Sequence, residues 1–345
     1  MAPEATCFPT YGFRAGAEWE IPIHVWLHTN HDVLERILTE VVGGFHGLTN
    51  EERENFRIRM ADLVSDDVKL WPVSIVFDRD QQQQTFSILD EAGVPCRTDL
   101  NGAVTGIVRL PVAAADQLLA AQSSTNGWLT FHTGQDAPGT GSVQLLEPTG
   151  DSVISDIDDT IKITEIPAGA EIVARNTFFR NFAAVAGMAE RYRTLGAQSF
   201  HYVSGGPWQL YRPEADYLIK TAGFPSGSFH LKPLDRNLMS LATWESLEEL
   251  AADRFDTKVA TFKHKVLQIT QLLTNLPQRK FILFGDSGEK DPEVYQLMRN
   301  EFPQLITEIH IRDVINDRVN HPERLAGMDR IDAPQILPGV DLIPS

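Results

Sequence analysis

Residues 150–164 read GDSVISDIDDTIKIT, and this stretch decides the fold class. A short apolar run, Ser152–Ser155, leads straight into a loop of acidic residues that begins at Asp156. From here to about residue 315, short β-rich runs alternate with stretches of helical periodicity. Strands separated by helices of this length indicate βαβ crossovers, so the sequence predicts an α/β fold with a parallel sheet.

The expected elements of this part follow one another in a regular order. The predicted strands are 152–155, 200–203, 228–231, 281–284 and 306–311. The predicted helices are 178–195, a helix with Pro213 in its first turn and Gly223 beyond its end, 244–254, 258–275 and 291–301.

The first 149 residues have a different pattern. β-rich runs recur between turn signals such as Asn101-Gly102, and two helical stretches, 31–42 and 50–64, interrupt them. The β-rich runs are 21–27, 72–77, 85–89, 104–110, 127–132 and 143–146. We therefore predict a β-rich, sandwich-like N-terminal domain over 1–149, an α/β domain over 150–320 and a C-terminal tail over 321–345.

Composition excludes several classes of protein. The 345 residues carry 30 Lys and Arg against 47 Asp and Glu, a net charge of -17, which argues against nucleic acid as a partner. The two cysteines, Cys7 and Cys96, cannot form a disulfide framework or a zinc cage and indicate a reducing compartment, the cytoplasm. The chain has no apolar run of roughly 18 residues and opens with no basic and apolar signal pattern, so neither a spanning helix nor a secretory signal is expected.

Polar clusters follow three of the predicted strands. The first strand runs into Asp156-Ile157-Asp158-Asp159-Thr160, the second into Ser204-Gly205-Gly206, and the third into Gly285-Asp286, with Asp291 five residues later. Since the carboxyl ends of parallel strands meet at one edge of a sheet, these side chains are expected to form one site.

These residue types suit phosphoryl transfer through an aspartyl-phosphate. Asp156 could attack phosphorus in line if a hard cation such as Mg²⁺ neutralised the phosphate, and Asp158 could act as the general acid and base. The candidate metal ligands are Asp156, Asp158, Asp286 and Asp291. For Asp291 a second interpretation has equal weight, because it could simply begin a helix with Pro292 in the first turn.

The candidate phosphate-binding residues are Thr160, Ser204, Gly205 and one lysine. Glycine lets backbone N–H groups approach phosphate oxygens closely, and a lysine would balance the remaining charge. Lys263 and Lys265 both lie on the predicted helix before the third of these strands.

The order D-x-D-x-T, strand-Ser, Lys, G-D-x-x-x-x-D is similar to the haloacid dehalogenase superfamily of phosphatases. More narrowly, five segments between about residues 150 and 315 resemble the fungal actin-patch phosphatidate phosphatase family and its bacterial relatives. They are SDIDDTIKIT, FHYVSGGPWQLY, GFPSGSFHLK, FKHKVLQI and FILFGDSGEKDPEVY.

This resemblance implies a haloacid-dehalogenase-like Rossmannoid sheet and a Mg²⁺-dependent phosphatidate phosphatase. It implies Asp156 as the nucleophile, Asp158 as the acid and base, and Asp286 as a magnesium ligand. It also implies Ser204 as a phosphate binder and Lys265 as the motif lysine, because the family usually shows Lys four residues ahead of an Ile, here Ile269. Many members show Ser-Asn-Ser-Pro where this chain has Ser204-Gly205-Gly206-Pro207, a difference that bears on the phosphate loop and on substrate preference.

The expected partner is a phosphorylated lipid met transiently at a membrane surface, with a protein partner for the N-terminal domain. The stretch Thr177–Phe182, TFFRNF, could contact an anionic bilayer, but core packing of its Phe residues is the favoured interpretation. Two alternatives stay open: the same chemistry on another phosphomonoester (a phosphoprotein, inositol phosphate or metabolite), or a non-enzymatic module that binds lipid or a partner.

Overall fold

The computed structural model describes residues 2–29, 47–232 and 258–343. Contacts divide the chain into two compact units. Unit 1 comprises Met1–His31, Val64–Thr149 and Gly227–Phe229, and unit 2 comprises Asp32–Leu63, Gly150–Ser226 and His230–Ser345. The predicted helices at 31–42 and 244–254 lie outside the described residues.

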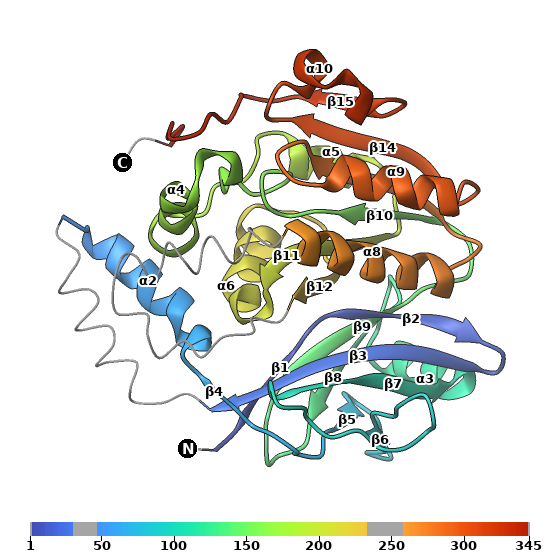
Figure 1. Cartoon of the computed structure of the whole chain (residues 1–345). Coiled ribbons are helices and arrows are strands. Elements are labelled where there is room, and N and C mark those ends of the chain that lie inside the picture. Colours follow the sequence, from blue (N-terminus) through green and yellow to red (C-terminus); the bar gives the residue numbers. More distant parts are fainter. Residues whose placement is uncertain (1, 30–46, 233–257, 344–345) are drawn as a thin grey trace. The chain divides into compact units, whose positions relative to one another are not determined.

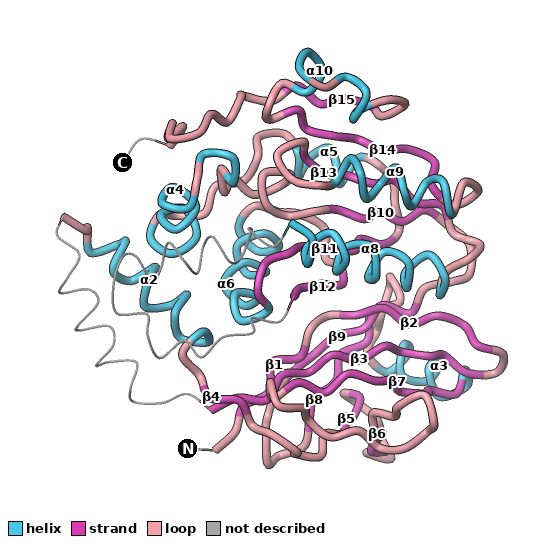
Figure 2. The backbone as a smooth tube through the Cα atoms, in the orientation of Figure 1, coloured by secondary structure: helices cyan, strands magenta, loops and turns pink. Residues whose placement is uncertain are grey.

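Unit 2 is built on a sheet of six strands in the order β12-β11-β10-β13-β14-β15 (Figures 1 and 2). β10 pairs in parallel with β11 and β13, and β14 pairs in parallel with β13 and β15. The strands are β10 (Asp151–Ser155), β11 (Ser199–Pro207), β12 (Ser228–Lys232), β13 (Lys280–Asp286), β14 (Ile306–Asp313) and β15 (Asp329–Asp332). The predicted α/β fold with a parallel sheet is confirmed.

Helices lie on both faces of this sheet. Neighbouring residues of a strand point to opposite faces, and on β13 Phe284 packs against Tyr192 of α5 while Gly285 faces Tyr295 of α9. Helix α8 packs against β11 and against α9, as Figure 1 shows. These helices are α5 (Met188–Thr194), α8 (Lys258–Asn275) and α9 (Asp291–Glu301).

The predicted continuous helix 178–195 is wrong. A short helix α4 (Ala170–Ala174) continues into a π-helical turn η2 (Arg175–Phe179), and the chain then runs without helix until α5 begins. In that interval Ala183 O accepts from the Ile163 N–H at 2.8 Å, and the Val185 N–H donates to Ile161 O at 2.9 Å. The backbone thus hydrogen-bonds to the loop after β10 instead of to itself, which outweighs local helix propensity.

The aromatic stretch after η2 is packed inside unit 2. Phe178 and Phe179 are buried, and Phe179 stacks on Phe56 with ring centroids 5.0 Å apart. Phe56 belongs to helix α2 (Asn50–Leu63), which matches the predicted helix 50–64 and is part of unit 2. The favoured core-packing interpretation of TFFRNF is confirmed for these two rings.

The residues predicted as a tail contribute regular structure. Within 321–345, a short 3-10 helix (Pro322–Leu325) precedes β15, the outermost strand on this side of the sheet. β15 pairs with β14 over the register His310–Asp329 to Asp313–Asp332. A four-residue strand carries too little hydrophobic pattern to be recognised in a sequence.

Unit 1 is a separate, mostly antiparallel sheet. Its strands follow the order β1-β3-β2-β9-β8-β5-β6, and β4 and β7 also pair with β3. Along β3 buried and partly buried residues alternate, so that Ile21, Ile23 and Val25 point into the core. The strands are β1 (Glu4–Cys7), β2 (Thr10–Ala15), β3 (Glu18–Thr29), β4 (Asp66–Asp67), β5 (Ser74–Phe77), β6 (Thr85–Ser87), β7 (Ala103–Pro111), β8 (Trp128–Thr133) and β9 (Thr140–Leu145).

All six β-rich runs predicted for this part overlap strands of the structure. β1, β2, β4 and the helix α3 (Val112–Ala121) were not predicted. Among the helices of the described part of the chain, none combines the length and the apolar character that a bilayer crossing requires.

Candidate active site

The predicted site residues lie at one edge of the unit 2 sheet. Asp156 follows the last residue of β10, Ser204 lies near the end of β11, and Asp286 is the last residue of β13. β10 is the central strand of the three, so its two neighbours bring their ends to either side of the Asp156 loop. All three side chains are buried.

Three carboxylates form a buried acidic cluster. Asp156, Asp286 and Asp291 each offer one oxygen, and these oxygens lie within 4.8 Å of one another. Asp291 is the first residue of α9 and its Oδ2 accepts a hydrogen bond from the Asp286 backbone N–H at 3.3 Å, so it both begins the helix and reaches the cluster. A Cβ at Gly285 would lie 2.6 Å from Asp291, which explains the glycine at this position.

Lys265 provides the positive charge of this cluster. Its Nζ lies 2.8 Å from Asp156 Oδ1, 2.5 Å from Asp291 Oδ1 and 3.1 Å from Glu289 Oε2. Burial disfavours the ammonium, but the neighbouring carboxylates outweigh burial and hold the Lys265 pKa well above its ordinary value. Lys263, the other lysine considered, is exposed on the same helix.

The acidic cluster fits a hard divalent cation. Burial raises the pKa of Asp156 well above its ordinary value, although the Lys265 ammonium opposes this rise. Burial and the Asp291 charge likewise raise the pKa of Asp286. Within the described part of the chain, Asp286 Oδ2 is buried without a hydrogen-bond partner. Carboxylate oxygens are the ligands that Mg²⁺ prefers, so these three residues could hold a metal.

Asp158 has different surroundings from the acidic cluster. Its Oδ1 lies 2.9 Å from Lys162 Nζ and accepts a hydrogen bond from Thr164 Oγ1 at 2.6 Å. Its Oδ2 accepts from Ser204 Oγ at 3.3 Å. Asp158, although predicted as a metal ligand, is therefore not one of the three clustered carboxylates; its carboxylate faces a lysine and two hydroxyl groups.

The predicted phosphate-binding residues surround the two motif aspartates. Thr160 Oγ1 donates to Asp156 Oδ2 at 3.1 Å, and Ser204 Oγ accepts from the Gly206 N–H at 2.9 Å. Gly205 is buried against α8, where a Cβ would lie 2.6 Å from the Thr261 side chain. Close packing against this helix is thus one reason for glycine at position 205.

Sequence reasoning missed three charged residues of the site. Lys162 is part of the quoted motif and lies four residues after Asp158, a spacing that could have indicated the ion pair. Glu289 lies inside the GDSGEKD segment, three residues after Asp286. Glu214 lies in the short helix α6 (Tyr211–Ala215), and no local pattern distinguishes it from a surface glutamate.

Residues 152–313 match the family model described as "Phosphatidate phosphatase APP1, catalytic domain". This part of the chain is similar to that family. The sequence resemblance to actin-patch phosphatidate phosphatases is thereby confirmed. A phosphatidate phosphatase is a phosphoric monoester hydrolase, so the predicted enzyme class agrees with the family.

Two fungal relatives show how far the likeness extends. Phosphatidate phosphatase APP1 of Saccharomyces cerevisiae is 34% identical over 182 residues, which are 51% of this chain and 28% of that protein. An uncharacterized protein of Schizosaccharomyces pombe is 31% identical over 180 residues, 51% of this chain and 27% of that protein. The chain therefore spans less than a third of the length of these relatives.

The structural match to a carbohydrate esterase covers 89% of this chain and 87% of the esterase chain, with 11% sequence identity and a TM-score of 0.21. A likeness this low supports no conclusion about fold or function.

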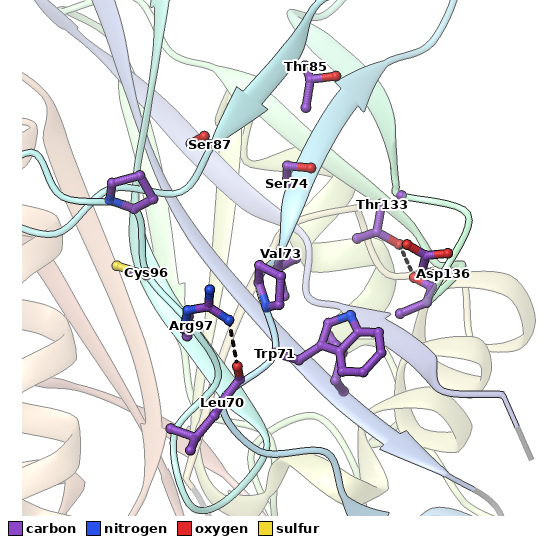
Figure 3. Close-up of a pocket in the computed structure, with 15 residues that line it drawn as sticks. Leu70, Trp71, Val73, Ser74, Thr85, Ser87, Cys96, Arg97, Thr133 and Asp136 are labelled. Atoms are coloured by element: carbon purple, nitrogen blue, oxygen red, sulfur yellow. Dashed lines mark hydrogen bonds between the residues drawn. The ribbon is translucent and has the colours of Figure 1, made fainter.

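A cavity of about 670 Å³ lies in unit 1 (Figure 3). It is lined by residues of the segments 70–74 and 95–97 and by neighbouring strands. Leu70 and Trp71, both exposed, lie at this cavity, and Arg97 Nη1 donates a hydrogen bond to Leu70 O at 3.0 Å. An exposed apolar surface beside a cavity is a feature of binding sites.

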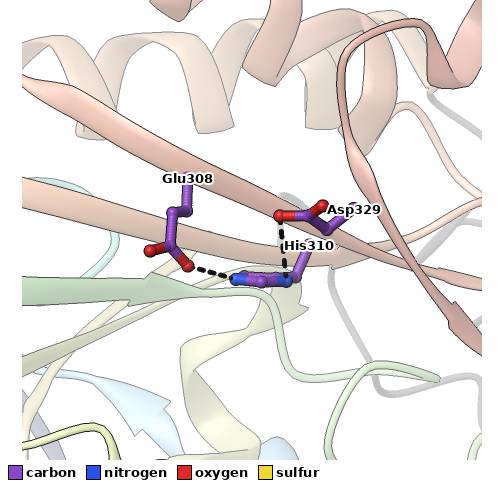
Figure 4. A group of neighbouring side chains, drawn as sticks. All are labelled: Glu308, His310 and Asp329. Carbon is purple, nitrogen blue, oxygen red and sulfur yellow. Dashed lines mark hydrogen bonds and ion pairs between the residues drawn. The ribbon is translucent and has the colours of Figure 1, made fainter.

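A second group of possible metal ligands lies on β14 and β15 (Figure 4). His310 Nε2 lies 2.8 Å from Glu308 Oε2, and Nδ1 lies 3.8 Å from Asp329 Oδ2. Arg191 Nη2 is also 3.2 Å from Nδ1. The two carboxylates lie beside different ring nitrogens, and each nitrogen has a partner in the protein. This arrangement suits an imidazole held by hydrogen bonds better than a metal ligand.

Proposed function

We propose that this chain is a Mg²⁺-dependent phosphatidate phosphatase, which hydrolyses phosphatidate to diacylglycerol and phosphate. The observation that carries the proposal is the buried cluster of Asp156, Asp286 and Asp291 with Lys265, which forms from separate segments inside the part of the chain that matches the phosphatidate phosphatase APP1 catalytic-domain model. The proposal includes a haloacid-dehalogenase-like arrangement of the parallel sheet and a sandwich-like arrangement of the N-terminal part. It also includes a functional division into 1–149, 150–320 and 321–345.

In the proposed first step, a carboxylate oxygen of Asp156 attacks phosphorus. The bond between phosphorus and the leaving oxygen breaks, and Asp158 donates its proton to that oxygen, so that diacylglycerol leaves and Asp156 carries the phosphoryl group. In the second step, Asp158 takes a proton from water while the water oxygen attacks phosphorus. The bond to Asp156 breaks, phosphate leaves, and both aspartates return to their starting states.

The surroundings of the two aspartates support this division of roles. Lys265 and Thr160 hold Asp156 at the acidic cluster, whereas Lys162, Thr164 and Ser204 hold Asp158 apart from it. Asp156, Asp286 and Asp291 would hold Mg²⁺, which supplies positive charge opposite the phosphate oxygens and the ionised nucleophile. Thr160, Ser204, Gly205 and Lys265 are the proposed phosphate-binding residues.

We propose that the enzyme acts in the cytoplasm and meets its lipid substrate by transient contact with a membrane surface. Unit 1 is the proposed site for a protein partner. The cavity with the exposed Leu70 and Trp71 supports this assignment, because exposed apolar surface of that kind favours binding.

The test measures phosphate release from phosphatidate in mixed micelles and from a soluble aryl phosphate, each with Mg²⁺ or with EDTA. Asp156→Asn removes the nucleophile, and Asp216→Asn, the same change at an exposed ion pair with Lys220, is the matched control. We expect Mg²⁺-dependent release from phosphatidate in the wild type and in Asp216→Asn, and its loss in Asp156→Asn.

Release from the soluble ester alone would retain the mechanism and transfer the search to water-soluble phosphomonoesters. Release from neither substrate would contradict the proposed activity. Release that persists in EDTA, or in Asp156→Asn, would contradict the cation or the nucleophile respectively.

A further inference from the structure

A buried three-residue network holds the carboxylate of Asp158. Lys162 Nζ lies 2.9 Å from Asp158 Oδ1 and 2.8 Å from Glu214 Oε1. The side chains of these three residues are at most 2% exposed. A lysine in such a position is costly to bury unless its charge is matched, and here two carboxylates match it.

The local fold brings Lys162 back towards Asp158. The N–H groups of Ile161 and Lys162 both donate to Ile157 O at 3.0 Å, which closes a tight turn after the motif. Ile157 and Ile161 are fully buried and anchor this turn in the core. Glu214 comes from α6, which follows β11 and the strand-end residue Ser204, so a second segment of the chain also holds the lysine.

The ammonium of Lys162 is already engaged inside the protein. A lysine has three N–H donors. Two face the carboxylates of Asp158 and Glu214, and Nζ lies 5.1 Å from the ring centroid of Phe182. Of the proposed catalytic residues Lys162 contacts the Asp158 carboxylate directly, so its influence on the reaction passes through Asp158.

We propose that Lys162, held by Glu214, is a positioning residue that fixes the Asp158 carboxyl group for proton transfer. This inference rests on the proposed phosphatase function. Lys162 and Thr164 both engage Oδ1, whereas Oδ2 lies 3.3 Å from Ser204 Oγ, towards the predicted phosphate-binding residue. Oδ2 is therefore the oxygen that gives the proton to the leaving oxygen and later takes one from water.

The experiment compares the full-length wild type with Lys162→Met on two substrates in the presence of Mg²⁺. Phosphatidate has an alkoxide leaving group that needs a proton, whereas the nitrophenolate of p-nitrophenyl phosphate leaves without one. We expect kcat on phosphatidate to fall about 100-fold, which is the decrease in rate that loss of a general acid typically causes. KM should change by less than about threefold. With p-nitrophenyl phosphate we expect a rapid burst of about one nitrophenolate per chain and then slow turnover, because the second step also needs Asp158 as the base.

Two further variants keep the test decisive if Lys162→Met does not fold. Glu214→Gln retains an oxygen that can accept from Lys162 and should keep most of the wild-type kcat. Glu214→Ala removes this acceptor and should show the burst followed by slow turnover. Lys220→Met, the same change as Lys162→Met at a lysine whose side chain is 74% exposed, serves as the control and should behave as the wild type.

The outcomes separate the two proposals. If the wild type hydrolyses neither substrate, the phosphatase proposal fails and this inference fails with it. If the wild type is active and Lys162→Met or Glu214→Ala retains wild-type kcat on phosphatidate, only the positioning role is refuted. Equal loss on both substrates without a burst would assign Lys162 and Glu214 a purely structural role and would also refute it.

Discussion

Replacing Lys265 by methionine should destabilise unit 2 strongly. Methionine is similar in length to lysine but removes the ammonium that lies within 3.1 Å of Asp156, Asp291 and Glu289. The Lys265 side chain is 2% exposed, so water cannot replace the lost charge. Like charges would then remain close together in a region of low dielectric constant.

The size of the effect follows from this burial. Removing one partner of a buried ion pair typically costs about 3–5 kcal/mol. For a domain of roughly 150–250 residues, 1 kcal/mol lowers Tm by about 2–4 °C. We therefore expect Lys265→Met to lower the Tm of the unfolding transition of unit 2 by about 6–20 °C.

The assay is thermal unfolding followed by circular dichroism at neutral pH, with EDTA present throughout so that no cation replaces the lysine. Asp291→Asn in the Lys265→Met background removes one of the repelling charges and should recover part of the lost Tm. A Tm decrease of less than about 3 °C would refute the reasoning about buried charge, since it is below the range expected for a buried pair. A further decrease on adding Asp291→Asn would refute it as well.

Three other predictions concern packing and protonation. Gly285→Ala places a Cβ 2.6 Å from Asp291 and should lower the free energy of unfolding, measured in urea, by about 1–3 kcal/mol. Gly134→Ala is the control, because open space surrounds that glycine, and it should leave stability nearly unchanged. Equal losses in the two variants would contradict the packing argument. Burial lowers the pKa of His230 from 6.5 to about 4. As pH falls below 6.5, the unfolded chain therefore takes up a proton that the folded chain excludes. The free energy of unfolding should decrease by about 3 kcal/mol between pH 6.5 and pH 4. His230→Asn should flatten this part of the Tm against pH profile, and an unchanged slope would be evidence against it. Phe56→Ala removes a fully buried ring and should lower the free energy of unfolding of unit 2 by about 3–5 kcal/mol in urea; a loss below about 1 kcal/mol would show that α2 contributes little to this core.

The parts of unit 2 that were predictable have strong local signals. The strand before Asp156 is a short apolar run that ends in acidic residues, and the strand before Asp286 repeats this pattern. Parallel strands end at the same edge, so the approach of these two residues follows from the order of strands and helices alone. The helix 258–275 was predicted with the bounds that the structure shows, because its apolar periodicity is long and regular.

The errors occur where contacts distant in sequence outweigh local preference. The segment 180–187 has helical composition, yet Ala183 and Val185 pair with the loop after β10. β15 is recognisable as a strand only through its register with β14, which lies more than a dozen residues earlier in the sequence. Neither interaction leaves a pattern within a window of ten or fifteen residues.

The sequence by itself determined the class of fold, the three strand ends that carry polar residues, and the aspartates that could exchange a phosphoryl group. These features depend on residue order and on short-range periodicity, which a single sequence displays. Only the tertiary structure decided how each carboxylate is held. It joined Asp156 to Lys265 and Asp158 to Lys162 and Glu214, because the position of a buried charge depends on the partners that folding brings within about 3 Å, whatever their separation along the chain.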